Sequence, residues 1–243
     1  GRDVLITSTA STVTGFGSDL AMLSGATITG QFGVGLSMSG TVSLATGSQI
    51  ISNDNGRDLN EDYPLTRLVN GPGGVYLQAS HILLDGEIRS YRSSGTGIGD
   101  IQIDAAPGVN SLIIGGAEGP GFTPGVLLIS DLEFQNLFGG VRIGATPLSR
   151  TDGLPITIRN LSIDGDQAPV LGIYNFGAND VTVSGVVQSV GASRPDVGIG
   201  NVLIYDNPTG NDVRVNEIPR DILVFGSLGT AAQPLGEVGL IAQ

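Results

Sequence analysis

Short aliphatic triplets with a polar residue in the middle recur along this chain and constrain its fold more than any other feature. Examples are "IQI" (101–103), "ITI" (156–158) and "VTV" (181–183). Aliphatic residues that skip one position are typical of a β-strand that buries one face. We therefore expect the flanking aliphatics to point inward, while middle residues such as Gln102 and Thr157 face solvent.

The triplets fall into families with a loose shared period. The first family starts at 101 and comprises IQI (101–103), LLI (127–129), ITI (156–158), VTV (181–183) and VRV (213–215). The second family comprises LII (112–114), VRI (141–143), LGI (171–173) and VLI (202–204). A third, weaker family comprises FQNL (134–137), LSIDG (161–165) and VVQSV (186–190). Strand families that share a period predict a repeat architecture.

The segments between the triplets have the composition of turns. Gly, Pro and Asn cluster at 115–125, 144–155 and 205–212. No stretch has the 3.6-residue periodicity of an amphipathic helix, so we predict an all-β chain without a helix. Three short strands and a turn-rich return, repeated, predict a parallel β-helix, that is, a single-stranded β-solenoid whose coils stack about 4.8 Å apart. The alternative is an antiparallel β-sandwich, which is also rich in short strands.

Composition excludes several classes of function. The formal net charge of -12 argues against binding to nucleic acid or to anionic membranes. The chain has no Lys and no Cys, which excludes lysine and thiolate chemistry and disulfides. No apolar run approaches the roughly 18 residues of a membrane span, so we expect no membrane insertion.

We expect residues 1–243 to form one β-solenoid domain. A loop insertion near 53–72 interrupts the strand pattern and is expected to project from one coil. The chain begins at Gly1 without a Met or a signal-peptide pattern, so we expect it to be a segment of a longer chain.

The central part of the sequence resembles the repeats of large bacterial exoproteins of the filamentous haemagglutinin type. The pattern is carried by "GGVYLQASHILLDGEIRSYRSSGTGIGDIQIDA" (73–105), and "GGVRIGA" (139–145) followed by "ITIRNLSIDG" (156–165) is similar. The resemblance covers residues 73–190. It implies a right-handed parallel β-helix and a secreted or surface-attached adhesin, and it transfers no catalytic residue.

Two sets of residues are candidates for metal binding or acid–base chemistry. Oxygen-rich loops bind Ca²⁺, and the segment 52–63 gathers four acidic candidates, although their spacing does not fit an EF-hand. These candidates are Asp54, Asp58, Glu61 and Asp62. Clustered carboxylates also serve β-helix glycosidases, and here the candidates are Asp104, Asp164 and Asp166. Turn aspartates that accept backbone N–H groups explain these three residues more simply.

The remaining candidates have structural explanations. His81 is the only histidine, and we expect it to lie on the surface, because no triad or metal cluster can be built around it nearby. Four aromatic residues are expected on or near one side of the rod, where they could stack on sugars or pack inside. They are Tyr174, Phe176, Tyr205 and Phe225.

The sequence favours a non-enzymatic role without a cofactor. We expect a structural or adhesive rod of a secreted or cell-surface bacterial exoprotein, which displays the loops 53–72, 115–125 and 144–155 or assembles into a fibre. Its expected partners are host-surface or matrix glycans and proteins, or copies of itself. The alternative is a carbohydrate-active β-helix, either a glycoside hydrolase or a tailspike-like polysaccharide-binding protein. An ice-binding β-helix would need regular Thr-x-Thr ladders, and only scattered "TIT" and "TVT" occur.

Overall fold

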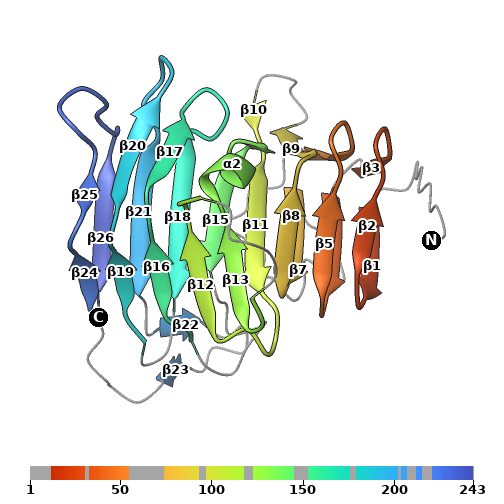
Figure 1. The fold of residues 1–243 in the computed structure, drawn as a ribbon, viewed down its shortest axis with the longest axis horizontal. Coiled ribbons are helices and arrows are strands. Elements are labelled where there is room, and N and C mark those ends of the chain that lie inside the picture. The colour runs from red at the N-terminus through yellow and green to blue at the C-terminus, as the bar shows by residue number, and fades with distance from the viewer. Residues whose placement is uncertain are drawn as a thin grey trace.

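The chain forms an elongated stack of short strands (Figure 1). In this computed structural model, nearly all strand pairs of the described residues are parallel. The one helix among them has four residues, and none is long and apolar enough to cross a membrane. The structure describes residues 12–30, 33–54, 74–92, 97–117, 123–144, 153–175, 179–201, 204–206, 212–214 and 221–242.

One sheet runs along the whole stack and contains eight parallel strands. At about 4.8 Å per strand, its outer strands lie about 34 Å apart. Its strands, in spatial order, are β1 (Thr12–Gly17), β4 (Gly33–Met38), β7 (Gly74–Ala79), β11 (Asp100–Ala105), β15 (Gly140–Gly144), β18 (Val170–Asn175), β21 (Asp196–Asn201) and β26 (Val238–Ala242).

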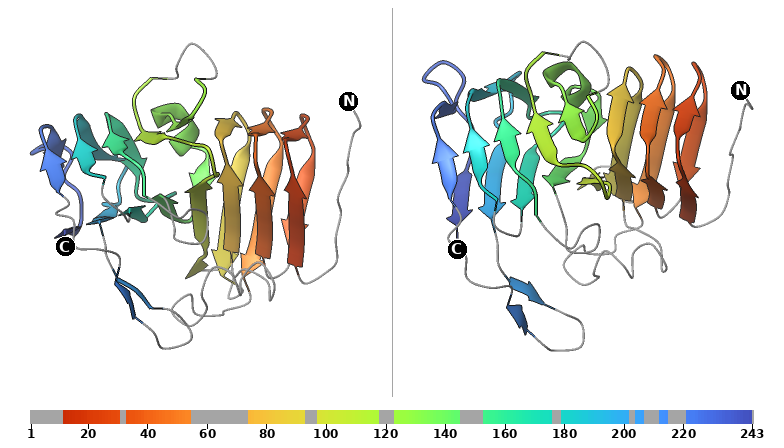
Figure 2. Two further views of the ribbon diagram at one scale, coloured as in Figure 1. Left: turned by 90° about the horizontal axis from the view of Figure 1, so that it is seen from below. Right: turned by 60° about the horizontal axis from the view of Figure 1, so that its bottom comes forward.

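Shorter sheets form the other sides of the stack (Figure 2). One three-stranded sheet comprises β2 (Leu20–Met22), β5 (Thr41–Leu44) and β8 (His81–Leu84). A five-stranded sheet comprises β13 (Val126–Ile129), β12 (Ser111–Ile114), β16 (Ile156–Ile158), β19 (Val181–Val183) and β24 (Ile222–Val224). A second three-stranded sheet comprises β17 (Leu161–Asp164), β20 (Val186–Val190) and β25 (Ser227–Leu228). The last sheet comprises β3 (Thr27–Gly30), β6 (Gln49–Asp54) and β9 (Glu87–Arg92), with β10 (Gly97–Ile98) and β14 (Leu137–Phe138) both paired to β9.

The chain visits these sheets in a repeating order. From β18 in the eight-stranded sheet it passes to β19 and β20 and returns to the same sheet at β21. Near the N-terminus it passes in the same way from β4 through β5 and β6 to β7. Each return places the new strand beside the earlier one in the same direction. The antiparallel sandwich, which was the alternative from sequence, is therefore wrong.

Buried aliphatic side chains stack in register across successive strands. In the eight-stranded sheet, Val75, Ile101, Val141, Leu171 and Val197 are consecutive register partners, and each is at most 2% exposed. Buried aliphatics from all the larger sheets join one hydrophobic cluster. The residues between the aliphatics are only partly buried, as the alternation predicts: Gln102, Arg142, Thr157 and Thr182.

The register between paired strands moves one triplet from each of the two main families into the other family. Ile101–Ile103 pairs with Val141–Ile143, so it belongs with the second family. Leu112–Ile114 pairs with Leu127–Ile129, so it belongs with the first family. The cause is unequal loop length, because 26 residues separate the partners Val75 and Ile101, whereas 40 separate Ile101 and Val141. The period of about 30 residues seen in the sequence is only the average of these unequal spacings.

The described residues of the last member of each family, 204 and 213–214, do not pair with the stacked sheets. The triplets 202–204 and 213–215 were expected to continue the ladders. Instead, β22 (Ile204–Asp206) and β23 (Asp212–Arg214) pair with each other in an antiparallel hairpin, and neither pairs with another sheet. The ladders are continued by β21, β24 and β26, and residues 202, 203 and 215 lie outside the described part.

The segment "FQNL" (134–137) is largely not a strand, and the expectation of a chain without a helix is wrong here. Residues Asp131–Phe134 form helix α2, and only Leu137–Phe138 forms a strand. A capping box starts the helix: the Ser130 hydroxyl accepts a hydrogen bond from the Glu133 N–H, and Glu133 Oε2 accepts one from the Ser130 N–H. Four residues are too few to show helical periodicity in the sequence.

Glycines occupy the turns where the backbone demands them. Gly25 and Gly47 follow β2 and β5 with φ of +79° and +81°, a left-handed conformation that favours glycine. At Gly226 the reason is space, because a Cβ would lie 1.8 Å from the carbonyl oxygen of Gly185 in the preceding coil.

The stacked aliphatics predict that substitutions at neighbouring positions of one strand lower the free energy of unfolding by very different amounts. Ile158 points inward and is 1% exposed, whereas Thr157 points outward. We expect Ile158→Ala to lower the free energy of unfolding by about 2–5 kcal/mol, because it leaves a cavity in the core. The matched variant Thr157→Ala is expected to change it by less than about 1 kcal/mol. Urea unfolding measures both, and similar losses would contradict the inward and outward assignment.

Candidate functional site

The outer face of the eight-stranded sheet carries a polar cluster centred on Asp104. The Tyr76 hydroxyl donates a hydrogen bond to Asp104 Oδ2 at 3.2 Å, and Gln102 Nε2 donates one to Asp104 Oδ1 at 3.2 Å. Asp104 points away from the aliphatic core, yet it is only 1% exposed. This carboxylate is therefore held inside a polar environment on the outer face of the sheet.

Further polar residues extend this cluster across four neighbouring strands. Gln78 is the register partner of Asp104 and accepts a hydrogen bond from the Ser37 hydroxyl at 2.5 Å. Arg142 is the register partner of Gln102 and forms an ion pair with Asp100 at 3.7 Å. We call this set the outer polar array, and its residues are Ser37, Tyr76, Gln78, Asp100, Gln102, Asp104 and Arg142.

Tyr76 is held in its protonated form. Burial of the phenol raises its pKa, and the negative charge of Asp104 and the hydrogen bond to Asp104 raise it further. A phenol in this state is a hydrogen-bond donor and not a base. The Tyr76–Asp104 pair therefore fixes the geometry of the array rather than supplying a labile proton.

The carboxylates of the outer polar array do not form a glycosidase pair. Asp100 and Asp104 lie on the same face of β11, four residues apart, which separates them by about 13 Å along the strand. Glycosidases place their two carboxyl groups about 5–9.5 Å apart. The nearest register partners of Asp104 are Gln78 and Gly144, and neither carries a carboxylate.

A second polar cluster lies on the sheet formed by β6, β9 and β14. Glu87 Oε2 accepts hydrogen bonds from Arg89 Nε at 2.8 Å and from Gln49 Nε2 at 2.9 Å. The Arg89 guanidinium also stacks on the Phe138 ring, 3.9 Å from its centroid. The hydrogen bond to Arg89 lowers the pKa of Glu87, and the same bond raises the pKa of Arg89. These contacts tie three strands together on their outer side.

The sequence predicts His81 on the surface, and this prediction is wrong, because the residue is buried. It starts β8, pairs in register with Thr41 and is 8% exposed. The burial lowers its pKa, because desolvation disfavours the imidazolium. In β8, His81 lies on the same side as exposed Leu83 and opposite Ile82 and Leu84, so it is covered on the outer side of the sheet and is not part of the aliphatic core.

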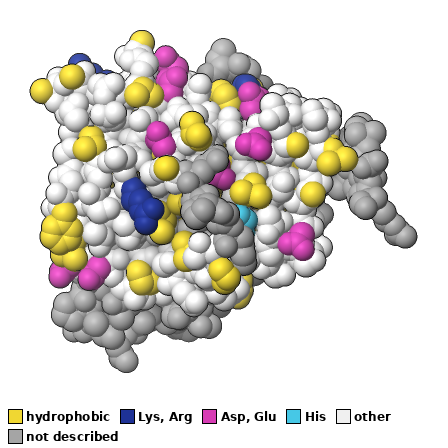
Figure 3. Space-filling model, viewed as in Figure 1, with side chains coloured by type: hydrophobic (Ala, Val, Ile, Leu, Met, Phe, Trp, Pro, Cys, Tyr) yellow, Lys and Arg dark blue, Asp and Glu magenta, His cyan; other side chains and the backbone are white. Residues whose placement is uncertain are grey.

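The acidic pair Asp164 and Asp166 makes turn contacts and lies away from Asp104. Asp164 Oδ1 accepts a hydrogen bond from the Asp166 N–H at 2.9 Å, and the Ser193 hydroxyl donates to Asp166 Oδ1. Asp164 ends β17 in a three-stranded sheet, whereas Asp104 belongs to the eight-stranded sheet. The structure does not bring these predicted acids together, and on the face seen in Figure 3 the acidic side chains lie scattered.

The predicted Ca²⁺ ligands fall at the edge of the described residues or beyond it. Strand β6 ends at Asp54, and Asp58, Glu61 and Asp62 lie outside the described residues, as does most of the expected insertion at 53–72. Within the described ranges, no three His, Cys, Asp or Glu side chains gather into a set that could hold a metal ion.

The aromatic candidates do not share one face. Tyr174 lies on β18 of the eight-stranded sheet and is 43% exposed, whereas Phe225 follows β24 of the five-stranded sheet and is 77% exposed. Both are surface residues and not core residues. Phe176 lies outside the described residues, and of Tyr205 the structure describes only the backbone, in β22.

Aspartate and asparagine side chains at the turns connect successive returns of the chain. Each accepts a hydrogen bond from a backbone N–H of the next return, so it adds to the backbone hydrogen bonds between neighbouring strands. Asp196 Oδ1, for example, accepts from the Glu237 N–H at 2.6 Å. The other turn residues with this role are Asp19, Asn160 and Asp180, and Asp131 at the start of helix α2 accepts in the same way from the Ser162 N–H.

Comparisons with known proteins identify no relative. No family model, no curated protein and no solved structure matches the chain. The resemblance to exoproteins of the filamentous haemagglutinin type therefore stays a prediction.

Sequence reasoning found Asp104 but missed its partners. Tyr76 and Gln102 belong to separate triplet segments, and a 26-residue step brings them side by side as register partners. The available signal was a polar residue at the outward position of consecutive strands. That signal becomes specific only when the register is known.

The protonated Tyr76 predicts a measurable loss of stability at alkaline pH. The pKa of Tyr76 is higher in the folded chain than in the unfolded chain, so above about pH 10 the unfolded state releases a proton that the folded state keeps. The free energy of unfolding is then expected to fall as the pH rises above about 10. Tyr76→Phe is expected to remove part of this fall. Urea unfolding at pH 7 and pH 11 measures the difference, and identical falls in both proteins would contradict it.

We expect the contribution of these turn side chains to stability to depend more on the acceptor oxygen than on the negative charge. We expect Asp196→Ala to lower the free energy of unfolding by roughly 0.5–1.5 kcal/mol, because the Glu237 N–H loses its acceptor. Asp196→Asn keeps an acceptor oxygen and is expected to retain most of the stability. Equal losses in both variants, measured by chemical unfolding, would assign the effect to charge instead.

Proposed function

We propose that the chain is a right-handed parallel β-solenoid that serves as a stiff structural or adhesive segment of a secreted or cell-surface bacterial exoprotein. The observation that carries this proposal is the eight-stranded parallel sheet, in which aliphatic residues of successive returns stack in register. The order in which the chain visits the sheets is that of a coil.

Stiffness follows from the direction of the hydrogen bonds. In such a coil the backbone ladders run along the long axis, so bending or stretching strains many hydrogen bonds at once. Side-chain bonds from turn residues such as Asp196 and Asn160 add to the ladders at the corners. The core is a continuous aliphatic cluster, so it adds to the stiffness along the whole stack.

The described surface suits adhesion. Phe16 and Tyr174 present exposed apolar side chains on the outer face of the eight-stranded sheet, and Leu132 on helix α2 and Phe225 after β24 present two more. Such groups can stack on sugar rings or pack against protein surfaces. Meanwhile Asp104, Asp164 and Asp166 are engaged in internal hydrogen bonds. The proposed partners are host-surface or matrix glycans and proteins, or further copies of the chain.

The outer polar array supports a second candidate function, a carbohydrate-active β-helix. It places a buried carboxylate, a protonated phenol and a guanidinium on one broad parallel sheet. Of these groups, the Arg142 guanidinium is partly exposed and can donate hydrogen bonds to sugar hydroxyls, whereas Tyr76 and Asp104 are engaged with each other.

One experiment separates the two candidates. The purified chain is passed over immobilised polysaccharides, glycans and matrix proteins, and both retention and release of reducing sugar are measured. Adhesion predicts retention on at least one surface without release of sugar. Release of reducing sugar would instead support the carbohydrate-active function, and loss of retention in Arg142→Ala would place sugar binding on the outer polar array. The heat-unfolded chain is the control for nonspecific retention.

A further inference from the structure

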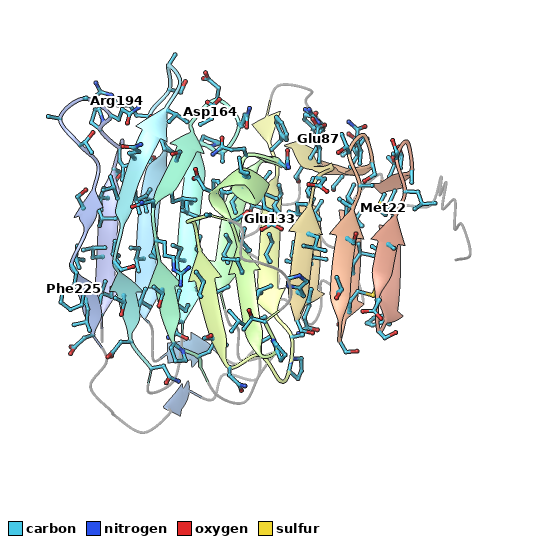
Figure 4. The ribbon with its side chains drawn as sticks, viewed as in Figure 1. Met22, Glu87, Glu133, Asp164, Arg194 and Phe225 are labelled. Atoms are coloured by element: carbon cyan, nitrogen blue, oxygen red, sulfur yellow. The ribbon has the colours of Figure 1, made fainter. Side chains whose placement is uncertain are left out.

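The C-terminal end of the described stack exposes three parallel edge strands at once. The eight-stranded sheet ends at β26, the five-stranded sheet at β24 and one three-stranded sheet at β25. Figure 1 shows these strands together at one end of the long axis, and Figure 4 places Phe225 at that end and Met22 at the other. Each edge strand pairs with the preceding return, and no described strand pairs with its other side. Edges of this kind are templates for a further strand.

The inward aliphatic residues of these edge strands are exposed, although their partners in the ladder belong to the core. Three of them are 40–47% exposed: Val224, Val238 and Leu240. Their register partners in the preceding return, Val183, Val197 and Ile199, are at most 2% exposed. The core ladder therefore reaches the C-terminal end uncovered, with the spacing that fits the aliphatic residues of one more parallel strand.

The N-terminal end of the stack is different. Met22 in β2 and Ile28 in β3 are inward residues of edge strands there, yet they are only 5% and 3% exposed. An exposed aliphatic ladder is therefore a property of the C-terminal end and not of both ends. The first return of another copy would bring a covered face and not a matching open one.

Backbone and carboxylate groups together fix where β24 starts on the preceding return. The Val181 N–H donates a hydrogen bond to the Asp221 carbonyl at 3.1 Å, and the Asp221 N–H donates one to Asp180 Oδ1 at 3.1 Å. The preceding return thus offers two groups, a carboxylate and the N–H of the residue after it. The incoming strand engages both groups with a single residue.

The eight-stranded sheet repeats this arrangement between β21 and β26. The Val197 N–H donates to the Glu237 carbonyl at 2.8 Å, and the Glu237 N–H donates to Asp196 Oδ1 at 2.6 Å. Two sheets of the stack therefore select the start of the next strand through the same pair of groups.

The last return carries this pair of groups again on its open side. Asp221 follows Asp180 at the same place in the ladder, and Glu237 follows Asp196. Both acids are exposed. Because N–H groups alternate between the two sides of a strand, the N–H of Ile222 points away from β19. A strand that binds here meets the same carboxylate and N–H that β24 itself meets on β19.

We propose that this end of the stack binds an extended segment of a second protein chain, which adds one more parallel coil on β24 and β25. One residue of the segment donates its N–H to the Asp221 carboxylate and accepts from the Ile222 N–H. Aliphatic residues at alternating positions of the segment then cover Val224 and Leu228. The inference goes beyond the proposed function, because the sides of the stack can adhere to glycans whether or not the end is filled.

A peptide with the sequence of residues 179–190 is the probe, because β19 and β20 in this segment carry the alternation that stacks with β24 and β25. Its binding to the whole chain is followed by fluorescence anisotropy, with a peptide of the same composition in scrambled order as the control. We expect saturable binding of the native sequence alone, and about tenfold slower hydrogen exchange of the Ile222 and Val224 amides in the complex. Absence of saturable binding up to about 1 mM peptide would overturn the proposal.

Matched variants of the chain locate the bound peptide. Val224→Ser is expected to weaken binding about tenfold, because it removes apolar contact at the open end. Val170→Ser changes a similarly exposed valine on the outer face of β18 and is expected to bind the peptide as the wild type does. Both valines are exposed, so both variants are expected to fold, which circular dichroism checks. Equal affinity in the two variants would place the peptide elsewhere and overturn the proposal.

N-methylation of the Asp180 amide in the peptide tests the contact with the Asp221 carboxylate, because it removes the donor. We expect weaker binding, and an unchanged affinity would overturn the proposed register.

Sedimentation of the chain without peptide tests the alternative occupant, a second copy. A monomer is expected, whereas a dimer that Val224→Ser dissociates would assign this end to self-association instead. Failure of peptide binding would leave retention on glycans and matrix proteins unchanged, so it is distinct from failure of the proposed function.

Discussion

The lateral pairing of parallel strands, each with an aliphatic inner face, is the constraint on which the rest of this structure depends. A single turn of the chain has only a few inward aliphatics and cannot bury them alone. When Val75, Ile101, Val141 and Leu171 stack, each covers its neighbours, and the backbone groups of each strand are satisfied by the next. Hydrophobic burial and backbone hydrogen bonding therefore require the same register.

Polar side chains take over wherever this pairing is interrupted. At corners, Asp196 and Asn160 accept backbone N–H groups of the following coil. Beside helix α2, Glu133 accepts the Leu84 N–H of β8, and Asp131 accepts the Ser162 N–H of β17. Many of the acidic residues behind the net charge of -12 thus have a structural explanation. A cluster of acids in such a chain is weak support for catalysis or metal binding.

The outer polar array and α2 show two uses of the same architecture. The array depends on the accurate register of the eight-stranded sheet, which sets Tyr76 beside Gln102 and within reach of Asp104. Helix α2 lies beside β8 and β17, and its side chains accept backbone N–H groups of both strands. The continuous sheet sets the array, and the side chains of α2 connect strands of two shorter sheets.

The sequence by itself determined the all-β character, the inward aliphatics and the turn segments, because alternation and turn composition are local properties. It did not determine which triplets become neighbours. Loop lengths vary between returns, so Ile101–Ile103 and Leu112–Ile114 changed families once the register was known. Burial of His81, the contact of Glu133 with Leu84 and the surroundings of Asp104 are likewise set by strands 26 to 49 residues away. Only the tertiary structure decides these contacts, since the distance along the chain carries no information about which strand lies alongside.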